Sequence, residues 1–274
     1  MSPEKSISHI QIGEEMIVIR DIHKTFSETE IGQRLNENIR WSMYVEELNL
    51  EKGEWQKTLG YDVNNLEHGQ LTYGIANRFV TAMENSNSEI KLSLEEKRLL
   101  LLTAIVHDWG EGMTKAGDVN YNRKTKEDER KELEALTDGL KDILGVETTN
   151  QIKEILEDTT TKLGQIFNVI EYIGYMRTGL KAWKKSKEIS DLKLAENLVW
   201  LNNNVLSNTT PKLIKYSEIY PPVKSFLESK KYIISEGFTN MPANIFNKYQ
   251  PDEREKFLTK FQKSKDSWQE WIID

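Results

Sequence analysis

Apolar residues recur every three or four positions along most of the chain, which is the period of an amphipathic helix. No stretch of useful length alternates apolar and polar residues, as a half-buried strand would. The pattern therefore predicts an all-α protein. A first clear helix follows Asn64 and Asn65, both good capping residues, and carries Leu71, Ile75 and Phe79 on one stripe.

A second helix is predicted to begin at Ser93, because Glu96 three residues later completes a capping-box pattern. It continues through the apolar run 99–106 to the dipeptide His107-Asp108, and we expect Gly110 and Gly112 to end it. A histidine and a carboxylate at the end of a buried helix must both lose water. A bound metal ion is a common way to offset that cost.

Further helical patterns cover the rest of the chain. They lie at about 125–145, 148–158, 162–187 and 194–205, and a last amphipathic helix carries Phe257, Phe261, Trp268 and Trp271. A turn-rich region is predicted around Pro211, Pro221, Pro222 and Pro242, and its aromatic residues indicate that it packs and is not a linker. Residues 1 to about 30 are the least regular part, where the run 16–19 predicts a strand or an irregular arm.

These patterns suggest one core with additions at both ends. We expect an N-terminal arm at 1–34, a core at 35–190 and a C-terminal helical extension at 191–274 that packs on the core. We expect the aromatic face of the last helix to cap the core, or alternatively to form the surface of a homodimer.

Composition narrows the class of protein. The 274 residues carry a formal net charge of −7, which opposes nonspecific adhesion to nucleic acid or anionic lipid. No apolar stretch has the length of a membrane span, and the first residues lack the features of a signal peptide, so we expect a cytoplasmic protein. There is no cysteine, so a transition metal would be held by histidines and carboxylates.

Such ligands are available on two of the predicted helices. His68 lies on or beside the apolar stripe of the first helix, and His107 and Asp108 end the second. A single buried histidine is more often a core residue that bonds to a neighbour. The combination of His68 with the His107-Asp108 pair favours a metal site over that alternative.

These motifs resemble the HD-domain superfamily of metal-dependent phosphohydrolases, and most closely its bacterial 5′-deoxynucleotidase branch. The likeness covers roughly residues 35–185. It rests on Glu67-His68, on His107-Asp108-Trp109-Gly110-Glu111 and on Gly117-Asp118. The resemblance implies an HD-domain helical bundle with additional terminal segments, and His68, His107 and Asp108 as metal ligands.

The resemblance also implies a fourth, acidic ligand on a later helix. Glu171 lies on the apolar side of the helix predicted at 162–187, where an unpaired carboxylate would be costly, and Asp158 is the alternative. The family normally has an aspartate there. Only four histidines exist and none follows His107, so the chain lacks the extra ligands of dinuclear relatives. We therefore expect one divalent ion, whether Mn, Co, Mg, Fe or Zn.

Roles for other residues follow from the same resemblance. Glu111 would position the attacking water or transfer its proton, and Asp118 would assist or protonate the leaving oxygen. Arg40 and Trp41 resemble an Arg-Trp pair beside the nucleoside, and Arg123 and Lys124 are cations available to phosphate. The alternatives are that Glu111 and Asp118 only cap helices or bind backbone, and that Trp41 is a core residue.

The function expected is hydrolysis of a phosphate ester of a small nucleotide, a nucleoside monophosphate or deoxynucleotide, through attack of a metal-bound water. Two alternatives stay open. One is a dNTP or alarmone hydrolase of the same fold. The other is a catalytically degenerate domain that binds a nucleotide or a protein partner, a reading motivated by the glutamate at position 171.

Overall fold

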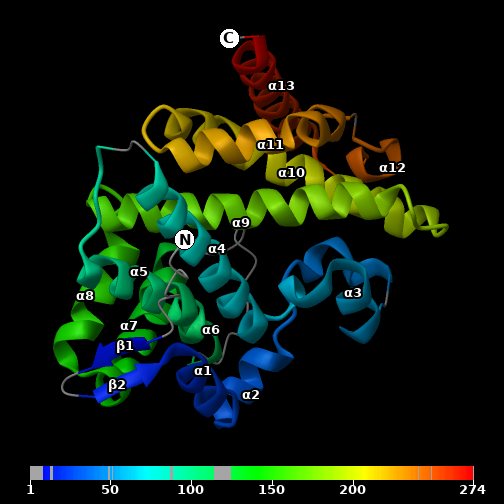
Figure 1. The fold of residues 1–274 in the computed structure, drawn as a ribbon. Coiled ribbons are helices and arrows are strands. Elements are labelled where there is room, and N and C mark those ends of the chain that lie inside the picture. The colour runs from blue at the N-terminus through cyan, green and yellow to red at the C-terminus, as the bar shows by residue number, and fades with distance from the viewer. Residues whose placement is uncertain are drawn as a thin grey trace. The chain divides into compact units, whose positions relative to one another are not determined.

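The structure is a computed structural model, and it describes residues 9–12, 15–48, 50, 52–86, 89–113, 125–239, 241–247 and 249–273. The fold is all-α, as the sequence predicts (Figure 1). The α-helices that order the described part of the chain are α1 (Ile19–Ser27), α2 (Glu30–Glu37), α3 (Lys52–Leu59), α4 (Asn65–Asn85), α5 (Leu94–Val106), α6 (Trp109–Met113), α7 (Lys126–Leu144), α8 (Val146–Glu157), α9 (Lys162–Ser186), α10 (Leu192–Ser217), α11 (Pro221–Gly237), α12 (Ala243–Phe246) and α13 (Pro251–Ile273).

The N-terminal part of the chain contains short strands and 3-10 turns. β1 (His9–Ile12) and β2 (Glu15–Val18) form an antiparallel hairpin in which Ile10 is opposite Ile17. The arm thus contains two strands, which agrees with the strand reading of its apolar run. Single 3-10 turns follow at η1 (Ser42–Tyr44), η2 (Glu46–Leu48) and η3 (Gly60–Val63).

Residue contacts divide the chain into two compact units. The first takes in the described residues up to Arg40 together with Tyr61–Thr81 and Ile90–Asn168. The second takes in those of Trp41–Gly60, Ala82–Glu89 and Val169–Asp274. α9 is one continuous helix that begins in the first unit, and these limits run differently from the boundaries expected at 34/35 and 190/191.

α5 is the centre of the first unit. The capping box of Ser93 and Glu96 starts it as predicted, and every residue from 99 to 106 is buried. α4 comes very close to it at Gly69, where an added Cβ would lie 2.5 Å from the carbonyl oxygen of Ile105. Only glycine allows this approach, which brings the neighbouring His68 toward the end of α5.

The prediction for Gly110 and Gly112 was wrong. α5 ends in a turn at His107 and Asp108, and both glycines lie inside the short helix α6. An added Cβ at Gly110 would lie 2.3 Å from the Glu132 carbonyl oxygen, and one at Gly112 would lie 2.5 Å from Leu35 Cγ. These glycines therefore allow α6 to pack closely on α7 and α2, and they do not act as helix stops.

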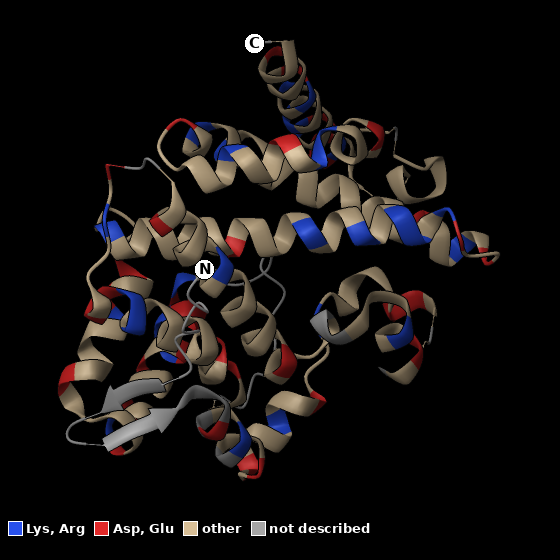
Figure 2. Cartoon of the chain, viewed as in Figure 1, with Lys and Arg blue, Asp and Glu red and all other residues tan. Residues whose placement is uncertain are grey.

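α7 carries many acidic and basic residues, coloured red and blue in Figure 2, and most of them are exposed. Thr125 and Asp128 form a capping box at its start. Arg130 bonds to the Glu127 carboxylate at 2.7 Å and also pairs with Glu134. Because these groups are exposed, we expect the pairs to contribute little to stability.

α10 is the centre of the second unit and packs against α11 and α13. The sequence predicted a turn around Pro211, but α10 continues through it. A proline in a helix leaves the carbonyl four residues earlier without its amide partner. Here that carbonyl belongs to Ser207, and the hydroxyl of Ser264 on α13 donates to it at 2.9 Å. The tertiary contact thus replaces the lost helical bond.

The other prolines lie where one helix ends and the next begins, which agrees with the predicted turn-rich region. Pro221 and Pro222 occupy the first turn of α11, where a missing N–H costs nothing, and Pro242 precedes α12.

Trp268 is buried and stacks on Trp271 with ring centroids 5.1 Å apart, so the aromatic face of α13 belongs to the core of this unit. Among the described residues, no helix combines the length and apolar character that a bilayer crossing requires.

Candidate metal centre

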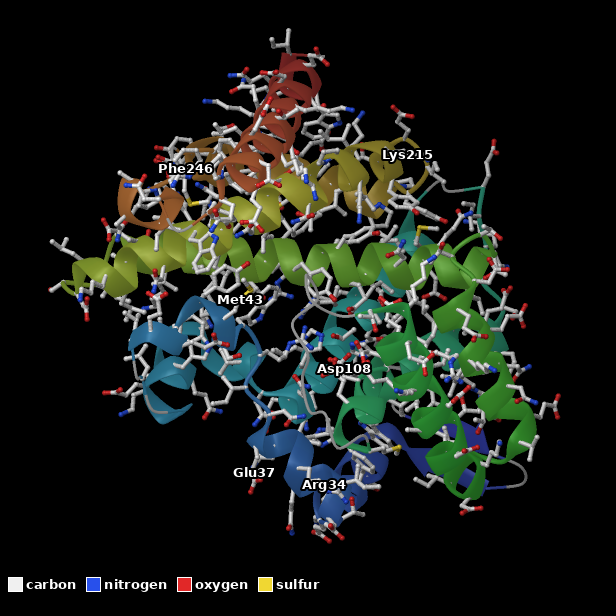
Figure 3. All side chains as sticks on the ribbon, turned by 180° about the vertical axis from the view of Figure 1, so that it is seen from behind. Arg34, Glu37, Met43, Asp108, Lys215 and Phe246 are labelled. Atoms are coloured by element: carbon white, nitrogen blue, oxygen red, sulfur yellow. The ribbon has the colours of Figure 1, made fainter. Side chains whose placement is uncertain are left out.

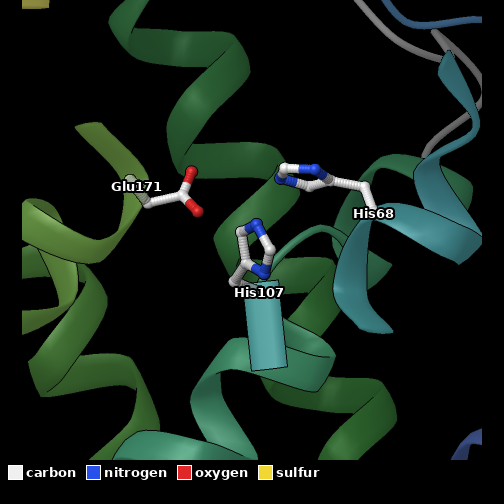
Figure 4. A group of neighbouring side chains, drawn as sticks. All are labelled: His68, His107 and Glu171. Atoms are coloured by element: carbon white, nitrogen blue, oxygen red, sulfur yellow. The ribbon is translucent and has the colours of Figure 1, made fainter. Parts of the chain in front are cut away.

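Three helices bring His68, His107 and Glu171 together. One ligand atom from each side chain lies within 4.8 Å of the other two, so a single ion can be shared by all three (Figure 4). His68 comes from α4, His107 from the end of α5 and Glu171 from α9. Two imidazoles and a carboxylate form a donor set suited to a first-row divalent metal.

His68 is held by contacts on both sides of it along α4. Its side chain is buried, and the Thr72 hydroxyl lies 3.2 Å from its Nε2. The buried His23 of α1 bonds through Nε2 to the Leu66 carbonyl at 3.0 Å and through Nδ1 to the Gln70 amide at 2.9 Å. These two bonds fit a neutral His23 that donates to the carbonyl and accepts from the amide. They fix the turn of α4 that carries His68.

His107 is oriented by its own helix. Its Nδ1 lies 3.1 Å from the Ala104 carbonyl oxygen and donates to it in the tautomer that leaves the lone pair on Nε2. The ring packs edge-on against Phe167, with centroids 5.4 Å apart. Glu171 follows Phe167 by one turn of the same continuous helix, so the same face of α9 carries both residues.

Asp108 lies beside both imidazoles. Its Oδ1 is 3.3 Å from His107 Nε2 and its Oδ2 is 3.8 Å from His68 Nε2. Arg40 forms an ion pair with Oδ2 in a part-buried environment (Asp108 is labelled in Figure 3). The shared group of ligand atoms includes Glu171 and not Asp108. The predicted ligand is therefore adjacent to the centre, with its charge balanced by a guanidinium.

Glu111 is a buried carboxylate in this region. Its backbone N–H donates to the Asp108 carbonyl at 3.1 Å, and the Asn65 amide donates to its Oε2. The Oδ1 of Asn65 is buried and has no hydrogen-bond partner in the described part of the chain. Asn65, noted in the sequence only as a capping residue, thus holds the side chain predicted to be catalytic.

Trp41 has an unusual backbone. Its φ of 63° lies in the left-handed region, and it is the only non-glycine residue with positive φ among those described. For a bulky side chain this conformation costs roughly 1–2 kcal/mol. The indole lies against Tyr175 and Tyr44, with centroids 5.9 and 6.3 Å away. Trp41 therefore belongs to an aromatic cluster, and it directly follows Arg40 in the chain.

The sequence also predicts four other site residues, one of them as an alternative ligand. Asp118, Arg123 and Lys124 lie outside the described residues. Asp158, the alternative ligand, ends α8 and accepts from the Thr160 hydroxyl at 2.6 Å and the Thr160 N–H at 2.8 Å. These bonds from Thr160 hold the pKa of Asp158 below its ordinary value. Among the described residues, the group of potential ligands contains Glu171 and not Asp158.

Comparison of the chain with protein-family models, with curated proteins and with solved structures gives no match.

Proposed function

We propose that the chain is a metal-dependent phosphohydrolase that cleaves a phosphate ester of a small nucleotide. The observation that carries this proposal is the convergence of His68, His107 and Glu171 on one point, with Asp108 beside the two imidazoles. Three protein ligands leave coordination positions for water and substrate, as catalytic metal sites require.

A divalent ion held by these three residues would supply positive charge for a phosphate oxygen and a more acidic water. The protein's own charges complement that role. Arg40 neutralises Asp108, so two carboxylates and one guanidinium lie around the two imidazoles. The two carboxylates beside the imidazoles favour a cation at this position.

Hydrolysis adds the oxygen of water to phosphorus and breaks the bond between phosphorus and the nucleoside oxygen. One water proton must leave, and the nucleoside oxygen takes up a proton. In this proposal Glu111 accepts the proton, since its carboxylate is buried within a turn of Asp108 and is oriented by Asn65. Arg40 contacts the substrate phosphate from its place beside Asp108.

The nucleotide class rests on the resemblance and on Trp41. An aromatic side chain next to Arg40 offers a surface for a base or a sugar, and its strained backbone is typical of residues with a functional constraint. A nucleoside monophosphate or deoxynucleotide is the substrate we propose.

The test is metal analysis of the purified chain followed by a phosphatase screen. Nucleoside monophosphates, dNTPs and guanosine alarmones are each supplied with Mn²⁺, Co²⁺, Mg²⁺, Fe²⁺ or Zn²⁺, and products are separated. Inorganic phosphate from a monophosphate supports the proposal. Pyrophosphate or triphosphate as product assigns the dNTP or alarmone alternative, and bound metal without turnover assigns a binding module. Absence of both metal and turnover contradicts all three.

A further inference from the structure

We propose that the second unit carries an anion site for a phosphoryl group, formed by Lys212, Lys260 and the hydroxyl of Tyr172. The inference does not depend on the proposed hydrolase function, because all three residues belong to α9, α10 and α13 within this unit and none takes part in the metal centre.

The two ammonium groups are held by neutral oxygen atoms. Lys212 Nζ donates to the Tyr172 hydroxyl at 3.0 Å and lies 4.3 Å from the centre of that ring. Lys260 Nζ donates to Asn208 Oδ1, and the Asn208 amide in turn donates to the Asn204 carbonyl at 2.7 Å. Asn208 is thus bonded at both ends of its amide, so it fixes the position of Lys260 on the face of α10 that also carries Lys212.

Neither lysine has a carboxylate partner among the described residues. This sets them apart from other lysines of the chain. Lys185 pairs with Glu188 at 2.7 Å, Lys187 with Glu236 at 2.9 Å, and Lys256 with Asp252 at 3.5 Å on the same helix as Lys260.

The two charges also act on each other. Burial, and then repulsion from Lys212, lower the pKa of Lys260. Two neighbouring cations without an anion are an unfavourable arrangement, and an anion between them relieves the repulsion. Lys215, labelled in Figure 3, adds positive charge three residues after Lys212 on α10.

The donor set fits a phosphoryl group. Each ammonium has three N–H donors and uses one in the bonds described, and the Tyr172 hydroxyl still has its own proton to donate after it accepts from Lys212. A phosphoryl group carries close to two negative charges and three acceptor oxygens, so it balances both lysines, whereas a carboxylate balances one.

Chemical protection of lysines tests the site directly. The full-length protein is acetylated with an amine-reactive ester in low-salt buffer, with and without inorganic pyrophosphate, and mass spectrometry measures the rate at each lysine. We expect pyrophosphate to slow acetylation of Lys212 and Lys260 at least fivefold. The rates at Lys256 and Lys193, which are exposed lysines of α13 and α10, should not change. Equal rates with and without pyrophosphate, or equal slowing of all four lysines, overturn the proposal.

Variants connect the protection to the two residues. In Lys212→Gln, protection of Lys260 should need about tenfold more pyrophosphate, since one of the two charge-assisted contacts is lost. Lys256→Gln removes a charge one turn away on α13 and should change nothing. Unchanged protection in Lys212→Gln contradicts the shared site. A parallel arm with ATP separates two sources of the group: equal protection assigns the phosphoryl group alone, and tighter protection by ATP assigns a nucleotide.

Discussion

Glu171 is the residue on which the metal centre depends most. A carboxylate on the apolar side of a long helix needs a partner for its charge, and here one of its oxygens lies within 4.8 Å of a ligand atom on each of two imidazoles (Figure 4). Glutamate has one methylene more than the aspartate expected from the resemblance. The additional reach lets a residue on α9 approach both histidines.

Removing the negative charge of the Glu171 side chain tests its role as a metal ligand. Glu171→Gln keeps the shape of the side chain but removes its charge, and we expect bound divalent metal to fall at least tenfold, as measured by mass spectrometry of the metal and by competition with a chelator. Asp158→Asn is the matched control, since Asp158 bonds to Thr160 outside the group. Loss of metal in Asp158→Asn with full retention in Glu171→Gln would reverse the assignment.

Asp108 and Glu111 are expected to respond differently to the loss of charge. Asp108→Asn removes the carboxylate beside both histidines, so we expect loss of metal. Glu111→Gln should keep the metal and lower kcat by about 10²–10⁴, the usual contribution of a positioned acid or base. Metal content and steady-state kinetics on the same samples separate the two effects. Retained metal in Asp108→Asn would show that Asp108 only balances Arg40.

At the scale of elements, α1 holds both segments that carry the centre. His23 bonds to α4 on either side of His68, and Phe26 stacks on Trp109 just after Asp108, with ring planes 4° apart. His23→Ala leaves the Leu66 carbonyl and the Gln70 amide without these partners, so we expect a loss of about 1–3 kcal/mol in the free energy of unfolding.

The measurement for α1 is urea unfolding combined with metal affinity. His23→Ala should also weaken metal binding, because the turn that carries His68 is no longer fixed. Lys24→Ala, at the exposed neighbouring position, is the control and should change neither quantity. A destabilised His23→Ala protein with unchanged metal affinity would limit His23 to a stabilising role.

A second element-scale contact lets α10 continue past Pro211. Ser264→Ala leaves the buried Ser207 carbonyl without a donor and should cost about 1–3 kcal/mol of unfolding free energy. In a Pro211→Ala background the new backbone N–H can bond to Ser207, so the same substitution should cost clearly less. Thr259→Ala, exposed on α13, is the surface control. Equal costs in both backgrounds, measured by a double-mutant cycle, would disprove this compensation.

At the scale of the whole molecule, local signals explain what could be predicted. The capping box at Ser93 explains the start of α5, and the helical period placed His68 on a buried stripe and His107 at the end of the buried run 99–106. The partners of the site come from distant segments and leave no local signal, as with Arg40 on Asp108 and Asn65 on Glu111. Likewise, the predicted turn at Pro211 was wrong because a hydroxyl on another helix decides that position.

Buried tyrosines make the stability of the whole chain sensitive to alkaline pH. Burial raises the pKa of Tyr44 well above its ordinary value of 10.0, and burial also raises the pKa of Tyr220 and Tyr73. Below about pH 10 both the folded and the unfolded chain keep these protons, so they add no pH dependence. Above that pH the unfolded chain loses protons that the folded chain retains. Stability must therefore fall as pH rises.

Tyr44→Phe tests this effect at the most buried of these positions. In urea unfolding from pH 8 to 11.5, we expect the free energy of unfolding of the wild type to be level up to about pH 9.5 and then to fall, each such tyrosine contributing at most about 1.4 kcal/mol per pH unit. Tyr44→Phe has no proton to lose at this position, so its free energy of unfolding should fall less steeply. An identical slope in Tyr44→Phe would mean that other groups cause the alkaline loss of stability.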